Sequence, residues 1–210
     1  MSDYIKVPHL IEERSFDMIT EELGDKIFPE DIGKIIKRVI HTTADFEYAD
    51  ITMISPNAIA SAQKAIKEGA HIVTDTKMAM AGINKTKLAK YGGEVHCFIS
   101  DEDVAQKAKE KGTTRAMAAM EKAMKDEKNK IFVIGNAPTA LFTLKECIEA
   151  GKVNPKLVIG VPVGFVGAAE SKEEFENLQV PYIVTRGRKG GSTVAAAIVN
   201  AILYMMNEPC

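Results

Sequence analysis

The chain of 210 residues contains no tryptophan, has only three cysteines and carries a net charge of only −2. Cys97, Cys147 and Cys210 are odd in number and none is spaced as C-x-x-C, so we expect neither a disulfide framework nor a structural zinc site. The small net charge argues against a broad nucleic-acid surface, which needs many cations for phosphates. Aromatic residues make up 6% of the chain, which disfavours a function built on base stacking.

Long apolar runs are also missing. The first fourteen residues carry charges and have no apolar core, so we expect no signal peptide. The longest apolar run, near Val194 to Met206, is interrupted by Asn200 and is too short to cross a bilayer. We therefore expect a cytoplasmic protein, not bound to a membrane, that forms a single domain over residues 1–210.

The absence of several motifs narrows the chemistry. The sequence has no phosphate loop of the form G-x-x-x-x-G-K-[ST], no G-x-G-x-x-G fingerprint and no G-x-S-x-G nucleophile elbow. His, Asp and Glu do not cluster at metal-ligand spacings, so we expect no metal site and no cofactor. A flavodoxin-like FMN protein is disfavoured, because no tryptophan is available to stack on a flavin and no Ser/Thr-rich phosphate loop follows the first strand.

Short apolar runs alternate with longer amphipathic ones along the chain. Runs of four to six residues, bounded by Gly, Pro, Asn or Asp, predict strands at Asp50–Ile54, His71–Asp75, Glu94–Ile99, Lys130–Ile134, Leu157–Val161 and Tyr182–Thr185. Helical patterns cover 11–23, 29–42, 57–68, 101–111, 114–125, 138–150, 171–178 and 191–206. We therefore predict an α/β fold with a doubly wound, mainly parallel sheet and a helical N-terminal extension.

Glycine-rich or polar loops follow four of the predicted strands, at the carboxyl edge where ligands bind in such sheets. They begin after Asp75, Ile134, Val161 and Thr185. Glycine lets the backbone approach a ligand closely, and the N-terminus of the next helix offers N–H groups to anions. The last loop adds Arg186, Arg188 and Lys189, so it is the strongest candidate for binding an anion. The alternative for each loop is a tight turn with solvated charges.

His41 is the histidine in the most suggestive place. The helix predicted over 31–42 has its apolar stripe at Ile32, Ile35, Ile36, Val39 and Ile40. His41 points almost opposite this stripe in the last turn, where a helix favours a cation, although Arg38 nearby opposes one. A histidine so placed can carry a proton near neutral pH. The alternative is an exposed surface histidine. His71 and His96, at strand starts, are interpreted as structural.

Five strings closely resemble the precorrin-8X methylmutase family, which includes the cobalt-precorrin-8 methylmutases of cobalamin biosynthesis. They are ERSF at 13–16, RVIH at 38–41, GNAPTAL at 135–141, GVPVGFVGAAESK at 160–172 and RGRKGGS at 186–192. The resemblance covers nearly the whole chain. It implies a flavodoxin-like fold and a homodimer whose site lies near the subunit interface.

The same resemblance implies an isomerase that moves a methyl group from C-11 to C-12 of precorrin-8X or cobalt-precorrin-8. This [1,5]-sigmatropic shift gives hydrogenobyrinate or cobyrinate. His41 matches the catalytic histidine of the family, which protonates or hydrogen-bonds to the macrocycle. The substrate contacts of the family match Ser15 and Arg38, and Arg115 is a further candidate. We also expect Arg186 and Arg188 to bind carboxylate arms of the substrate, and we expect further substrate contacts at Thr139, Ser171 and Ser192. The alternative function is a non-catalytic tetrapyrrole-binding or delivery protein, which would not need His41.

Overall fold

The computed structural model describes residues 6–207, and Cys210 lies outside this range. A six-stranded sheet runs through the molecule in the order β1-β6-β5-β4-β2-β3. Its strands are β1 (Thr52–Ile54), β2 (His71–Thr74), β3 (Val95–His96), β4 (Asn129–Ile134), β5 (Leu157–Gly160) and β6 (Tyr182–Thr185). All neighbouring strands are parallel except β1 and β6, so the prediction of a mainly parallel sheet is confirmed.

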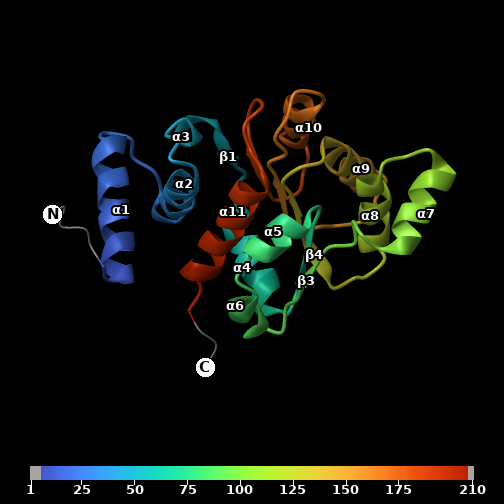
Figure 1. Ribbon diagram of the computed structural model, residues 1–210, viewed down its shortest axis with the longest axis horizontal. Helices are drawn as coiled ribbons and strands as arrows, with labels where there is room; N and C mark the ends of the chain where they lie inside the picture. Colours follow the sequence, from blue (N-terminus) through green and yellow to red (C-terminus); the bar gives the residue numbers. More distant parts are fainter. Residues whose placement is uncertain (1–5, 208–210) are drawn as a thin grey trace.

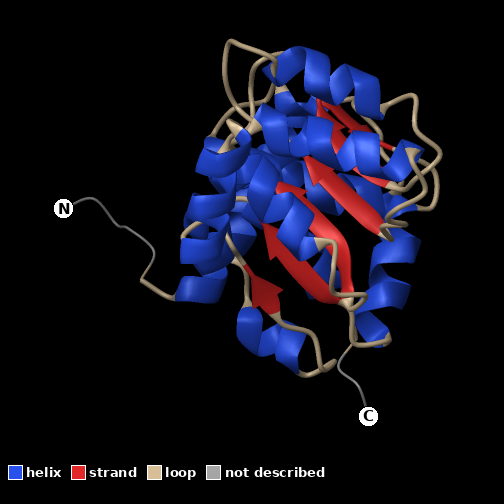
Figure 2. Cartoon of the chain, turned by 90° about the vertical axis from the view of Figure 1, so that its right-hand side faces the viewer, coloured by secondary structure: helices blue, strands red, loops and turns tan. Residues whose placement is uncertain are grey.

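Helices cover both faces of the sheet (Figure 2). They are α1 (Pro8–Leu23), α2 (Glu30–Thr43), α3 (Tyr48–Ile51), α4 (Ala58–Lys67), α5 (Lys77–Gly82), α6 (Lys85–Ala89), α7 (Glu102–Lys111), α8 (Arg115–Ala123), α9 (Pro138–Glu149), α10 (Ala168–Phe175) and α11 (Ser192–Met205). The predicted N-terminal helices are confirmed as α1 and α2. α2 packs on α11, and α1 stands beyond α2 at one end of the molecule (Figure 1). Within residues 6–207, no helix has the length and apolarity to span a membrane.

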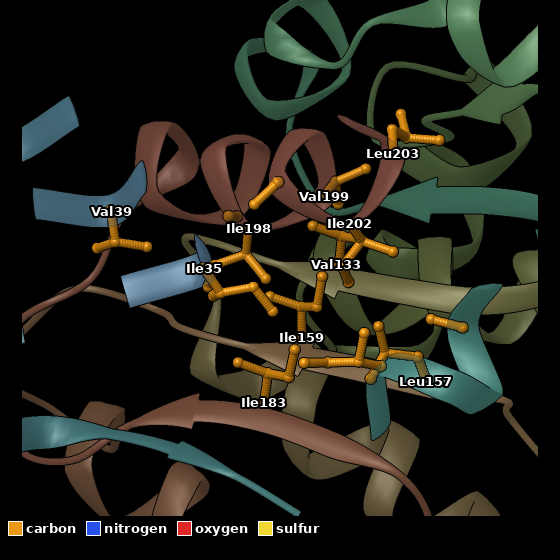
Figure 3. Close-up of a cluster of buried hydrophobic side chains, with 14 of the residues drawn as sticks. Ile35, Val39, Val133, Leu157, Ile159, Ile183, Ile198, Val199, Ile202 and Leu203 are labelled. Carbon is orange, nitrogen blue, oxygen red and sulfur yellow. The ribbon is translucent and has the colours of Figure 1, made fainter. Parts of the chain in front are cut away.

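Alternating side chains of the inner strands enter two separate cores. In β4, Ile131 and Val133 join the core under α2, α4 and α11, whereas Phe132 and Ile134 join the core under α8 and α9. Figure 3 shows the first core, where Val133 lies near Ile198 and Ile202 of α11. Each such side chain contributes about 1.5–3 kcal/mol on full burial. Burial on both faces explains why these strands read as continuous apolar runs.

The edges of the sheet differ from the sequence prediction. β1 is antiparallel to β6 and begins only at Thr52, because residues 48–51 form the short helix α3. β3 contains two residues instead of the six predicted over Glu94–Ile99, since it pairs with β2 alone. α5 and α6 were not predicted. α10 begins at Ala168 after Gly167, whose φ is 75°, so the helix predicted to start at Ser171 begins earlier.

Candidate active site

The amphipathic pattern of α2 sets the position of His41. Ile35 and Val39 are completely buried against α11 and the sheet, while His41 in the last turn is exposed. The orientation predicted from the helical spacing is therefore confirmed. α1 lies along this same side of α2, so side chains of α1 are the first neighbours of His41.

Phe16 of α1 is the residue that organises this group. Its ring stacks on the His41 ring with the centroids 5.2 Å apart and the planes 17° from parallel. The guanidinium carbon of Arg38 lies 4.7 Å from the centroid of the same ring. Stacking and cation–π contact together restrict the orientations of both polar side chains. Sequence reasoning did not single out Phe16, although it lies within the ERSF string.

Arg38 is already partnered in this structure. Its Nη1 lies 2.8 Å from the Glu12 carboxylate, and its guanidinium carbon lies 5.2 Å from the centroid of Tyr204 in α11. The Arg38 side chain is 21% exposed and that of Glu12 is 50% exposed, so the pair can be reached from solvent. An incoming carboxylate could therefore take the place of Glu12 on Arg38 with the same geometry.

Two small hollows lie between α1 and α2, one beside His41 and one beside Arg38. One, of about 220 Å³, is lined by Ser15, Met18, Ile19, Glu22, Ile40, His41, Ala44 and Phe46. The other, of about 270 Å³, is lined by Phe16, Lys34, Lys37, Arg38, Ala201, Tyr204 and Met205. Ser15 lines the first hollow. Its hydroxyl donates to the Ile11 carbonyl at 2.7 Å, so its oxygen is still available as an acceptor.

The carboxyl edge of the sheet forms a second group of candidate residues, and buried Asp75 lies at its centre. Its carboxylate accepts the backbone N–H groups of Gly135, Asn136 and Ala137 at 2.7–2.9 Å. Burial raises the pKa of Asp75, and the three donors oppose that rise. The loop after β4 was expected to suit an external anion, but these three N–H groups already bind a carboxylate of the protein itself.

Two hydrogen-bonded pairs of hydroxyl side chains lie along the same carboxyl edge as Asp75. Thr76 and Ser192 are joined through their hydroxyls at 2.7 Å, and Thr114 and Thr139 at 3.0 Å. Arg115 is exposed at the start of α8, directly after Thr114. The structure therefore brings Thr139 and Arg115 together. Within residues 6–207, neither makes a hydrogen bond, ion pair or ring contact with His41.

The cations of the last loop are mostly paired. Arg186 binds Glu176 through two hydrogen bonds of 2.6 and 2.9 Å. Lys189 binds both Asp45 and Glu47 in the turn after α2, and these carboxylates raise its pKa. The contact connects the helix of His41 to the sheet edge. It also means that Arg186 and Lys189 are not the free anion-binding cations that the sequence suggested.

Arg188 and Ser171 have opposite environments. Arg188 is exposed, its guanidinium carbon lies 5.3 Å from the centroid of the Phe165 ring, and it has no ion-pair partner among residues 6–207. Ser171 is only 1% exposed, and its hydroxyl donates to the Ala168 carbonyl within α10. Ser171 thus lies inside α10, which the string GAAESK continues, and its side chain is closed off from solvent there. This burial disfavours Ser171 as a substrate contact, and its role stays a prediction.

No group of three or more His, Cys, Asp or Glu in the described part of the chain could hold a metal ion. Cys97 and Cys147 are free and half-buried. The chemistry available in these two groups is that of the exposed His41, arginines beside aromatic rings, and hydroxyls at the starts of α5, α8, α9 and α11. These groups suit the binding of an acidic molecule and the donation of a proton or hydrogen bond.

Comparison with known proteins decides the family. A model of the precorrin-8X methylmutase family matches residues 10–205. The chain belongs to this family. It is 51% identical to the cobalt-precorrin-8 methylmutase of Priestia megaterium over 96% of this chain and 89% of that protein. The protein of the same name from Salmonella typhimurium is also 51% identical, over 98% and 99%.

A solved structure of the family has the same fold. The precorrin-8X methylmutase of Thermus thermophilus superposes with a TM-score of 0.85 at 38% identity, over 93% of this chain and 96% of that one. The resemblance stated from the five sequence strings is therefore confirmed.

Proposed function

We propose that this member of the methylmutase family is an isomerase that moves a methyl group from C-11 to C-12 of precorrin-8X or cobalt-precorrin-8. The product is hydrogenobyrinate or cobyrinate, depending on whether the substrate carries cobalt. Relatives named cobalt-precorrin-8 methylmutase at 51% identity support the assignment. In the structure, the observation that carries it is the stacked group of His41, Phe16 and Arg38 on the exposed side of α2.

His41 acts in this proposal as a general acid or hydrogen-bond donor to the macrocycle. A rearrangement within one molecule needs no external nucleophile, leaving group or redox partner, so the protein has to bind, orient and stabilise developing charge. The ring of Phe16 fixes the plane of the imidazole at the end of α2. This fixed orientation prepares His41 to place a proton or hydrogen bond on the conjugated ring as the methyl group moves.

Arg38 binds a carboxylate arm of the substrate in the place that Glu12 occupies here. Arginine–carboxylate pairs favour two parallel hydrogen bonds, which also orient the arm. Ser15 beside His41 supplies a further polar contact. At the sheet edge, the further contacts we propose are Arg115, Thr139, Arg188 and Ser192, and Arg186 only by release from Glu176.

A homodimer completes this site. The hollow beside His41, about 220 Å³, lies below the usual range of about 300–1,000 Å³ for ligand pockets, so one chain does not enclose a macrocycle. The side chains of Leu10, Ile11 and Met18 in α1 are 42–54% exposed, and this apolar surface supports the packing of a second copy near the hollow.

We also propose a cytoplasmic location. Without β1, the strand order follows the flavodoxin-like pattern, which supports that architecture.

The test replaces His41 by alanine and follows the absorption change as metal-free or cobalt-loaded precorrin-8 is converted. We expect the variant to fold and to bind the corrinoid product but to lose turnover by about 10²–10⁴-fold, the usual contribution of a general acid. Thr42→Ala is the matched control, because Thr42 is the exposed neighbour whose hydroxyl bonds only within α2. Turnover by His41→Ala at the wild-type rate contradicts the assignment and favours the tetrapyrrole carrier.

Mixing His41→Ala with Arg115→Ala tests the two-chain arrangement. If each site combines His41 of one chain with Arg115 of the other, random pairing in a twofold dimer restores about a quarter of the activity. If both groups act within one chain, the mixture stays inactive.

A further inference from the structure

Lys172 in α10 is a completely buried lysine that the proposed chemistry does not use. Its exposed fraction is 0%, yet it makes no ion pair with a carboxylate in residues 6–207. Lysine is almost never fully buried unless paired. Its Nζ donates instead to two backbone carbonyls, those of Pro162 at 3.1 Å and Lys189 at 2.9 Å.

The two carbonyls belong to the loops that follow neighbouring strands β5 and β6. Backbone bonds join the same loops: Gly164 N–H donates to the Arg188 carbonyl, and Gly191 N–H donates to the Val161 carbonyl. The approach is tight, since a Cβ at Gly190 would lie 2.1 Å from the Val161 oxygen. Lys172 is therefore a buried side-chain link across the seam between these two loops, which the two backbone hydrogen bonds also hold together.

The seam carries groups that face outward. On one side, Phe165 is 81% exposed, and on the other Arg188 lies over its ring. Lys189, whose carbonyl Lys172 holds, extends its own side chain to Asp45 and Glu47 after α2. The distance between the two loops thus determines the position of the Arg188 side chain. It also affects the position of Lys189, which connects the carboxyl edge of the sheet to the turn after α2.

The fold carries an energetic cost at this position. Burial lowers the pKa of Lys172 to about 8, because water no longer stabilises the ammonium ion. Replacing the lysine by an apolar side chain of similar length removes this cost, but it also leaves the Pro162 carbonyl without its donor. Because these two effects oppose each other, we expect Lys172 to contribute more to the geometry of the two loops than to stability.

We propose that Lys172 is a positioning residue that sets the spacing of the β5 and β6 loops and thereby aims Arg188 at a carboxylate arm of the substrate. The proposal rests on the proposed function, because the substrate is the acidic macrocycle named there. Lys172 does not itself touch the substrate. Its removal should weaken binding while the chemical step, which depends on His41, proceeds at nearly the same rate.

The test compares Lys172→Met with Phe175→Leu, a variant in the same helix that disturbs the core without touching the seam. We expect Lys172→Met to raise KM and the dissociation constant of the corrinoid product about tenfold, in line with the sensitivity of sites to small misplacements, and to change kcat less than twofold. Phe175→Leu should lower the urea midpoint but leave KM unchanged. In a double-mutant cycle, Lys172→Met should add little to Arg188→Gln, because both act through one contact.

Hydrogen exchange supplies a readout independent of activity. The amides of Gly164 and Gly191, which donate across the seam, should exchange faster in Lys172→Met than in Phe175→Leu. If Lys172→Met fails to fold, Thr185→Val is the second variant, because the Thr185 hydroxyl also donates to the Lys189 carbonyl. We expect Thr185→Val to raise KM as well. Unchanged KM and unchanged exchange in the folded variant overturn the proposal. A wild-type protein that neither binds nor converts the corrinoid overturns the proposed function instead, whatever the exchange data show.

Discussion

The carboxylate of Asp75 holds three backbone N–H groups, so its replacement by alanine tests how the sheet edge is built. Gly135 is buried, and its N–H would lose its partner without access to water, at a cost of about 1–3 kcal/mol. Asn136 is exposed and Ala137 half-buried, so water replaces part of their bonds and each loss is about 0.5–1.5 kcal/mol. Because the cost of burying the charge disappears as well, we expect a net decrease in the free energy of unfolding of about 2–4 kcal/mol.

The assay is urea unfolding followed by circular dichroism at pH 7, with linear extrapolation to water. Asp75→Asn should fall between wild type and Asp75→Ala, since the amide keeps one acceptor oxygen. Asp103→Ala is the control, because Asp103 is an exposed carboxylate that pairs with Lys122 on the surface. If Asp75→Ala shifts the midpoint no more than Asp103→Ala does, the three hydrogen bonds do not hold this edge together.

Two further predictions concern charge. Glu12→Gln should tighten binding of the corrinoid product by up to about fivefold, because the carboxylate that competes for Arg38 is removed; a titration that shows equal or weaker binding contradicts the replacement of Glu12 by substrate. Burial, and secondly His96 beside it, lower the pKa of His71 in the folded chain below the value of 6.5 for the unfolded one. The unfolded state therefore binds more protons as the pH falls through 6.5, and the free energy of unfolding should fall there. His71→Leu should flatten that dependence in urea midpoints measured between pH 7 and 5, and an unchanged slope would refute it.

The inner strands and their helices could be predicted from the sequence because burial on both faces leaves a local pattern. β4, β5 and β6 were located to within one residue at each end, since nearly every position in them is buried. β1 and β3 were less predictable. An edge strand pairs on one side only, so its length and direction depend on what the preceding segment does, as α3 shows before β1.

The residues of the candidate site also differ in how far the sequence could predict them. His41 was placed correctly because its orientation follows from the spacing of α2 alone. Phe16 and Glu12 were missed because their contacts depend on how α1 packs across α2, and no periodicity encodes that crossing. Asp75 had a usable signal, because it directly follows the apolar run of β2 and a carboxylate buried there needs hydrogen-bond donors.

The cations of the last loop show that ion pairs depend on the folded structure and cannot be inferred from the number of charges in the sequence. RGRKGGS contains three cations, which predicted an anion-binding loop with Arg186 and Arg188 as substrate contacts. Arg186 is neutralised by Glu176, ten residues earlier, and Lys189 by Asp45 and Glu47, which lie more than 140 residues away along the chain. Arg188 alone among the three lacks a carboxylate partner in residues 6–207. Folding thus uses most of the positive charge of this loop to fasten the loop itself, and within residues 6–207 it leaves Arg188 without a carboxylate partner.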